Sequence, residues 1–183
     1  MAYLYQNALH VVSRAGDAGH LIDLTAPSGS AAPLDLTAGA HTTLAVPVPA
    51  ATYRPTTYTK AGEAPRIVFR TLHGPIWQIE RDTLNAINLT GAANAPNAAG
   101  SPSAVAVAAT VHILYRGFDG TVNDIFDDGH VWSTQQVCSD VAASDPTAYV
   151  DELGHAAASF RTSQGRIRVA RFVNGNWQCE DTV

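Results

Sequence analysis

Arg116, Asp124 and Trp132 combine the side-chain types that sugar recognition requires. An indole face packs against the apolar C–H face of a pyranose, while guanidinium and carboxylate groups hydrogen-bond to its hydroxyls. Arg161 and Trp177 occur at matching places later in the chain. We interpret these five as candidate ligand-binding residues. Two structural alternatives remain: the arginines bond to turn carbonyls or to Asp, and the tryptophans belong to the core.

A second group of candidates consists of His10, Arg66, His112 and Tyr115. The period of two along a strand places His10, Arg66 and His112 on the faces that also carry nearby arginines. If those strands line a central channel, the three side chains point into a polar lumen that would suit an anion, ordered water or a small ligand. In a dry pocket the four residues would instead polarise a carbonyl. The alternative function is therefore a cofactor-free enzyme that cyclises, isomerises or cycloadds a hydrophobic metabolite.

All of these candidates belong to a repeat. Four times an apolar stretch ends in Arg, is followed by a Gly-containing turn, and continues as a second alternating stretch. The repeated arginines, at intervals of 56, 46 and 45 residues, are Arg14, Arg70, Arg116 and Arg161. A hairpin repeated at this period predicts a propeller-like array whose units bury their faces against one another.

The third repeat defines the expected unit most clearly. Its strands are expected at His112–Arg116, Thr121–Phe126, His130–Cys138 and Thr147–Val150. Four such units predict an all-β fold, a small β-propeller of four four-stranded antiparallel blades in one domain. A β-sandwich of short strands is the alternative.

The fourth repeat ends before a fourth strand, and residues 2–5 have the required pattern. We therefore expect the N-terminal strand to complete the last blade and close the ring, which would leave no open edge. The expected blades are blade 1 at about 9–60, blade 2 at about 65–108, blade 3 at about 111–150, and blade 4 at about 155–183 plus 2–5.

Composition excludes several classes of partner. The formal net charge of −5 provides no basic field for nucleic acid. No apolar run approaches the roughly 20 residues that span a bilayer. The first residues lack the charged start and apolar core of a signal peptide, so a cytoplasmic protein and a secreted one with its leader removed both stay open. A monomer and a face-to-face dimer are both compatible with the sequence.

The chemistry of metals and cofactors has little support. The seven histidines lack metal-ligand spacing, and no P-loop, dinucleotide or nucleophile-elbow motif is present. We predict no metal and no cofactor. Cys138 and Cys179 follow tryptophans in adjacent repeats and could form one bridge. Two thiols do not identify a redox compartment, and we slightly favour free thiols.

The repeat resembles the blade of bacterial and fungal lectin-like propellers, the fucose-lectin-like and tectonin-like blades. That blade reads approximately Y-R-G-x-D-G-H-I-x-E-L, then W, a D-L-T segment and A-P. The matching segments are Tyr115–Gly120 with Trp132 in repeat 3, Gly19–Leu24 with Leu34–Thr37 in repeat 1, and Ile87–Thr90 in repeat 2.

The resemblance implies sugar sites between blades, each built from an Arg, an acidic residue and an aromatic wall. The acidic position holds Asp23, Gln78, Asp124 and Val169, so two repeats lack the carboxylate. We expect a carbohydrate-binding protein that recognises neutral or fucosylated sugars near repeats 3 and 4. The enzyme and a protein-interaction ring remain alternatives.

Overall fold

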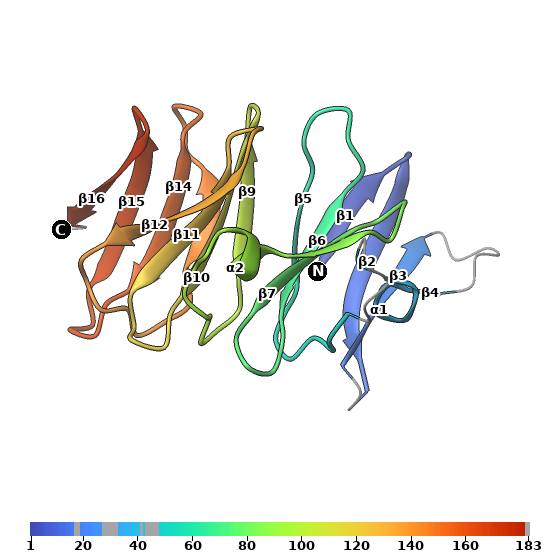
Figure 1. Cartoon of the computed structure of the whole chain (residues 1–183). Helices are drawn as coiled ribbons and strands as arrows, with labels where there is room; N and C mark the ends of the chain where they lie inside the picture. The colour runs from blue at the N-terminus through green and yellow to red at the C-terminus, as the bar shows by residue number, and fades with distance from the viewer. Residues whose placement is uncertain (17–18, 27–32, 41, 43–47, 182–183) are drawn as a thin grey trace.

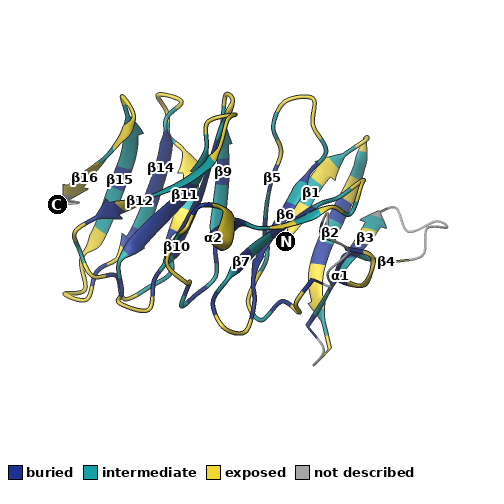
Figure 2. Ribbon diagram, in the orientation of Figure 1, coloured by how far each residue is buried: buried dark blue, intermediate teal, exposed yellow. Residues whose placement is uncertain are grey.

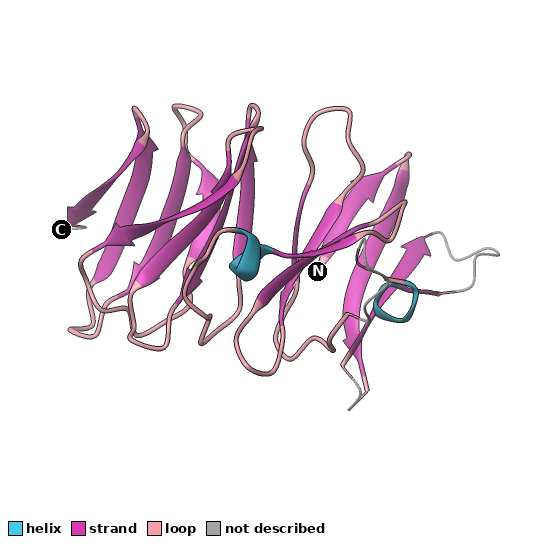
Figure 3. Ribbon diagram, viewed as in Figure 1, coloured by secondary structure: helices cyan, strands magenta, loops and turns pink. Residues whose placement is uncertain are grey.

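The computed structural model of the chain contains four antiparallel sheets of four strands each, placed one after another (Figures 1 and 3). It describes residues 1–16, 19–26, 33–40, 42 and 48–181. Each sheet uses four consecutive strands, and its strand order follows the chain. The architecture confirms the expected all-β propeller with four four-stranded blades.

The strand bounds are as follows. Blade 1 contains β1 (Ala2–Tyr5), β2 (Ala8–Ala15), β3 (His20–Ala26) and β4 (Leu34–Asp35). Blade 2 contains β5 (Thr56–Tyr58), β6 (Arg66–Arg70), β7 (Ile76–Glu80) and β8 (Ala86–Asn88). Blade 3 contains β9 (Ser103–Val107), β10 (Thr110–Arg116), β11 (Val122–Asp127) and β12 (Trp132–Cys138). Blade 4 contains β13 (Thr147–Val150), β14 (Ala156–Arg161), β15 (Ile167–Val173) and β16 (Asn176–Asp181).

The N-terminal strand does not close the ring. β1 pairs with β2 in blade 1, and blade 4 is completed by its own β16, so the expected shared blade is wrong. The reason is a two-residue hairpin turn, Gln6-Asn7, between the paired residues Tyr5 and Ala8. Both turn residues have positive φ, 48° and 62°, which matches the twist of the flanking strands. β9 and β13, expected to end blades 2 and 3, likewise begin the blades that follow.

The four blades form an open array rather than a closed circle. In Figure 1 blade 1 and blade 4 lie at opposite ends of the molecule, with blades 2 and 3 between them. The edge strands β5, β9 and β13 contact one another in succession. The backbone N–H of Ala104 donates to Thr56 Oγ1 at 3.2 Å, and that of Ala148 donates to Ser103 Oγ at 2.9 Å. These edge strands therefore form the inner side of the array.

A short linker segment joins each blade to the next by backbone hydrogen bonds. At the junction of blades 2 and 3, the N–H of Ala98 donates to the Gly74 carbonyl at 2.9 Å, and the N–H of Ala99 donates to the Arg116 carbonyl at 2.7 Å. Gly74 has φ of 102°, and a Cβ added there would lie 2.9 Å from the Ala98 oxygen, so the close approach requires glycine. The same two bonds recur at the other junctions, through Ala51 with Thr52 and Ala142 with Ala143.

The D-L-T and N-L-T segments of the resemblance form one-turn helices, α1 (Leu36–Gly39) and α2 (Leu89–Ala92). Asp35 and Asn88 cap them by accepting from backbone N–H groups. The Thr90 hydroxyl accepts from the Ile76 N–H at 2.7 Å, so the motif attaches the helix to its sheet. Among the described residues, no helix is long and apolar enough to cross a membrane.

The core lies between the blades (Figure 2). In each of blades 1 to 3, the face that carries the repeated Arg packs on the following blade. The following blade makes this contact with the face that lacks its own repeated Arg, and that face is apolar. In blade 2, for example, Phe69 and Ile79 pack against blade 1. Val68, which precedes Phe69 and therefore lies on the opposite face, packs against blade 3. The strict alternation of strand side chains thus divides each blade into two different packing faces.

The two cysteines form a disulfide between blades 3 and 4, which overturns the preference for free thiols. Cys138 ends β12 and Cys179 lies in β16, with a Cα–Cα distance of 6.1 Å. Both residues occupy the last strands of their sheets, and these strands face each other. The linear sequence showed equivalent positions in adjacent repeats, but only the packing of the two blades brought the sulfur atoms together.

We predict that this bridge stabilises the last blade. It encloses a sequence separation of 41 residues, for which the loss of loop entropy in the unfolded chain is worth about 4 kcal/mol. The double variant Cys138→Ser/Cys179→Ser is therefore expected to unfold at lower denaturant concentration than the oxidised protein. Dithiothreitol should lower the midpoint of the native protein to the same extent and leave the double variant unchanged. Equal midpoints with and without reductant would contradict a stabilising bridge.

Candidate functional site

Asp124 is the centre of a buried polar cluster between blades 3 and 4. It is 0 % exposed. Its Oδ2 lies 2.8 Å from His112 Nδ1 and accepts from Trp177 Nε1 at 2.9 Å and Gln135 Nε2 at 3.1 Å. The His112 ring also contacts the rings of Phe172 and Trp177. Three of these side chains come from blade 3, and the two aromatic ones come from blade 4.

Asp23 forms the equivalent cluster between blades 1 and 2. His10 Nδ1 lies 3.1 Å from Asp23 Oδ2, and the Tyr3 ring stacks on His10 with its hydroxyl donating to the same carboxylate. Arg81 of blade 2 donates from Nε to Asp23 at 3.3 Å. Burial, with the Asp23 charge beside it, raises the pKa of Tyr3, so the phenol stays protonated. Both Asp clusters therefore join a His of one blade to a donor of the next.

This burial changes the interpretation of the second candidate group. His10 and His112 are 3 % and 1 % exposed and lie between blades, because β2 and β10 are the second strands of their sheets. They do not point into a lumen. Arg66 pairs with Glu63 and Glu80. The Tyr115 hydroxyl donates to the Pro96 carbonyl at 2.8 Å, and burial raises its pKa.

The first candidate group is divided between two faces of blade 3. Asp124 and Trp177 meet as described, but Trp132 packs against the cluster between blades 2 and 3. Trp132 is the register partner of Asp127 on the adjacent strand β11. Asp127 Oδ2 lies 2.9 Å from Lys60 Nζ of blade 2. Arg116, Asp124 and Trp132 therefore do not surround one cleft. No group of three or more His, Cys, Asp or Glu side chains in the described ranges is placed to hold a metal ion.

The four repeated arginines occupy four different environments. Arg70 is buried: its Nε donates to the Ala98 carbonyl at 2.6 Å, and the Tyr53 ring lies 4.4 Å from its guanidinium carbon. The Nε of Arg116 lies 3.5 Å from Asp145 Oδ1. Arg161 is exposed on blade 4, and no side-chain partner is found for it in the described part of the chain.

Arg14 differs from the other three because it is both exposed and held in place. Its Nε donates to the Ala51 carbonyl at 3.0 Å, which is the contact that Arg70 makes with Ala98. An arginine carries five N–H donors, so the two terminal nitrogens of Arg14 retain four for a ligand. Sequence reasoning selected Arg116 and Arg161 because tryptophans accompany them in repeats 3 and 4, and it passed over Arg14 because repeat 1 has no such Trp. Only packing shows that Arg14 is exposed and oriented.

Two pockets meet at Arg14. The first, about 650 Å³, lies between blades 1 and 2 and combines apolar walls with a few polar groups. Trp77 and Leu72 supply apolar surface, and His73 and Asn88 supply hydrogen-bonding groups. We call it the Trp77 cleft. None of the arginines and tryptophans predicted from the sequence to bind sugar lines this cleft; they are Arg116, Arg161, Trp132 and Trp177.

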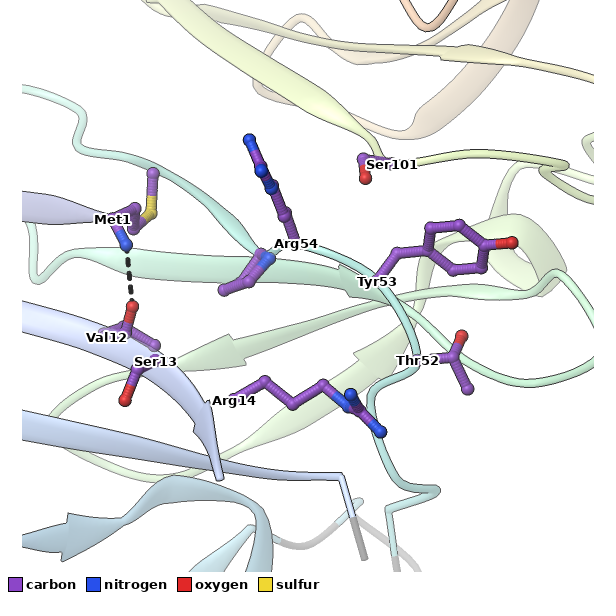
Figure 4. Close-up of a pocket in the computed structure, with 9 residues that line it drawn as sticks. Met1, Val12, Ser13, Arg14, Thr52, Tyr53, Arg54 and Ser101 are labelled. Carbon is purple, nitrogen blue, oxygen red and sulfur yellow. Dashed lines mark hydrogen bonds between the residues drawn. The ribbon is translucent and has the colours of Figure 1, made fainter. Parts of the chain in front are cut away.

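The second pocket, about 720 Å³, lies on the other side of Arg14 (Figure 4). Its lining includes Tyr53 and Arg54 of the segment before β5 and Ser101 of blade 3's linker. In Figure 4 the Arg14 side chain extends toward Thr52, and both residues belong to each pocket. His10, Arg66, His112 and Tyr115 are absent from the described linings of these two pockets.

We predict that the main role of the Asp124 cluster is to stabilise the junction between blades 3 and 4. Substitution of Trp177 tests this role. Trp177→Phe keeps a ring but removes the N–H that donates to a buried carboxylate, and should cost about 1–3 kcal/mol in the free energy of unfolding. Trp132→Phe is the matched control, because the described structure contains no hydrogen bond from its indole N–H. Urea denaturation of both variants measures the difference. Equal losses in the two variants would show that the Trp177–Asp124 bond contributes nothing.

No family model and no curated protein match the chain. Solved structures do match it. The fucose lectin from Kordia zhangzhouensis, in complex with methyl-fucoside, has a TM-score of 0.51 at 12 % identity, over 71 % of this chain and 99 % of its own. AofleA from Arthrobotrys oligospora has a TM-score of 0.61 at 15 % identity, over 96 % of this chain and 53 % of its own. A mutant of the Aleuria aurantia lectin AAL in complex with Fucalpha1-6GlcNAc has a TM-score of 0.56 at 12 % identity, over 96 % of this chain and 56 % of its own. The chain thus has a fucose-lectin-like fold and spans about half the length of the latter two proteins.

Proposed function

We propose that the protein is a carbohydrate-binding lectin that recognises neutral or fucosylated sugars, and that its primary site is the Trp77 cleft. The observation that carries the proposal is the exposed Arg14 guanidinium, oriented by the Ala51 carbonyl at 3.0 Å in an inter-blade cleft of about 650 Å³. A fixed guanidinium loses little further entropy when it binds a pair of vicinal hydroxyls.

The composition of the cleft supports a sugar ligand. The indole of Trp77, with Leu72 and Pro75, offers apolar surface for the C–H face of a pyranose. Asn88 and His73 add hydrogen-bond donors and acceptors. A small number of placed polar groups within apolar walls is typical of small-ligand sites.

The shared fold also supports the proposal. The Kordia protein is a fucose lectin in complex with methyl-fucoside, and the AAL structure holds Fucalpha1-6GlcNAc. At 12 % identity these matches extend to the fold, and the choice of sugar for this chain rests on the cleft.

The site near repeats 3 and 4 remains a second proposed site, with fewer usable groups. Arg116 and Arg161 reach solvent at least in part, whereas Asp124 is fully buried and already accepts from Trp177. We propose Arg116 and Arg161 as its contact residues, with Asp124, Trp132 and Trp177 positioning the blades.

Calorimetric titration with methyl α-L-fucoside, preceded by a glycan array, tests the function. We expect Arg14→Gln to weaken binding by about tenfold to a hundredfold, because hydrogen bonds from a charged donor are lost. Arg161→Gln is the comparison variant: it removes an exposed arginine at the equivalent repeat position and measures the contribution of the second proposed site.

Each other outcome has a defined meaning. Loss of affinity only in Arg161→Gln would move the site to repeats 3 and 4 and reject the Trp77 cleft. The absence of binding to every glycan on the array, with native circular dichroism, would reject the lectin function itself.

A further inference from the structure

The three junctions inside the chain follow one rule. The face of a blade that carries the repeated Arg contacts the following blade, and the face turned toward the preceding blade is apolar. At the last junction Leu114 and Val122 of blade 3 pack against Ala158 and Phe160 of blade 4. Two faces have no counterpart among the residues that the structure describes: the apolar face of blade 1, opposite Arg14, and the following face of blade 4, which carries Arg161.

The free face of blade 1 is apolar across its first three strands. Leu4 pairs with Leu9, and Val11 pairs with Leu24, so their side chains lie on one side of the sheet in adjacent rows. Leu4 is 77 % exposed, and Leu9 and Leu24 are each 43 % exposed. Ile22 lies on the same side. In blade 2 the corresponding face, with Ile67 and Phe69, is fully buried by blade 1.

The free face of blade 4 has the mixed character of the faces that cover such surfaces. Val169 lies between Ser159 and Glu180 on neighbouring strands, and Ile167 is 49 % exposed. Arg171 is held by Asp151 and Glu180, so its charge has partners before any association. Such a face can be buried without leaving an unpaired arginine.

We propose that the protein assembles head to tail, with the following face of blade 4 in one copy packed on the apolar face of blade 1 in a second copy. The two faces continue a packing rule that the chain already uses three times. Such a heterologous contact closes into a ring when the rotation between copies allows it. Arg161, exposed in the single chain, would then lie in an inter-blade cleft as Arg14 does.

The two free faces favour a second copy as the occupant, because each copy presents both halves of the junction that the chain already forms three times. The chain matches AofleA and AAL over 96 % of its own length but only 53 % and 56 % of theirs. These two lectins therefore contain further structure beyond the part that matches the four blades. This inference rests on the fold and the uncovered faces, and it is independent of sugar binding.

Light scattering coupled to gel filtration, over a range of micromolar concentrations, tests the assembly. We expect a mass of at least twice that of the 19.3 kDa chain. Leu24→Glu and Val169→Glu each place a carboxylate on one of the two faces, and each alone should raise the dissociation constant at least a hundredfold. Leu72→Glu is the control: Leu72 is 68 % exposed in the turn after β6, away from both faces.

A mixture of the two variants identifies the geometry. In a head-to-tail contact, the intact blade 4 of Leu24→Glu fits the intact blade 1 of Val169→Glu, so an equimolar mixture should form a dimer although each variant alone is monomeric. A Val169→Glu protein that still dimerises would indicate blade 1 against blade 1 and overturn the proposal. A monomeric native protein at 100-micromolar concentration, on the order of 10⁻⁴ M, would overturn it as well. Circular dichroism and thermal unfolding verify that every variant is folded.

Discussion

The linker peptide that joins each pair of blades is the constraint on which the arrangement depends. Its two consecutive N–H groups donate to a turn glycine carbonyl of one blade and to the arginine carbonyl of the next, as Ala98 and Ala99 do for Gly74 and Arg116. Backbone groups that are buried must be paired, so these bonds hold the blades at one spacing. Where Arg14 and Arg70 donate back to the linker carbonyls, the side chain completes the same joint.

Function is proposed where this joint is open to solvent. At blades 2 and 3 the Tyr53 ring covers Arg70 and the joint is buried, whereas between blades 1 and 2 the equivalent Arg14 borders two pockets. A single structural role, orientation of an arginine by a linker carbonyl, thus provides a core contact at one junction and a candidate binding group at another. The repeats all keep the arginine, and they differ in how far that arginine is buried.

The two Asp clusters add a second, polar set of contacts between blades. Asp23 and Asp124 are almost fully buried and accept from Arg81 and Trp177 of the following blades. A buried carboxylate without such donors would be strongly destabilising, so blade 1 depends on blade 2 and blade 3 depends on blade 4. The disulfide between Cys138 and Cys179 adds a covalent link between blades 3 and 4 at the last of these junctions.

The sequence alone determined the class of fold, because the repeated alternation of apolar residues and the glycine turns are local signals read within one hairpin. The strands of repeat 3 were predicted within two residues of β10 to β13. The sequence could not determine which sheet a strand joins, and the Gln6-Asn7 turn, which lacks glycine, concealed the pairing of β1 with β2. Tertiary structure alone decided that Trp132 and Asp124 lie on opposite faces, that the cysteines meet, and that Arg14 is both exposed and held by a linker carbonyl. These are properties of packing between blades, and residues with identical local patterns acquire different surroundings only when the blades are assembled.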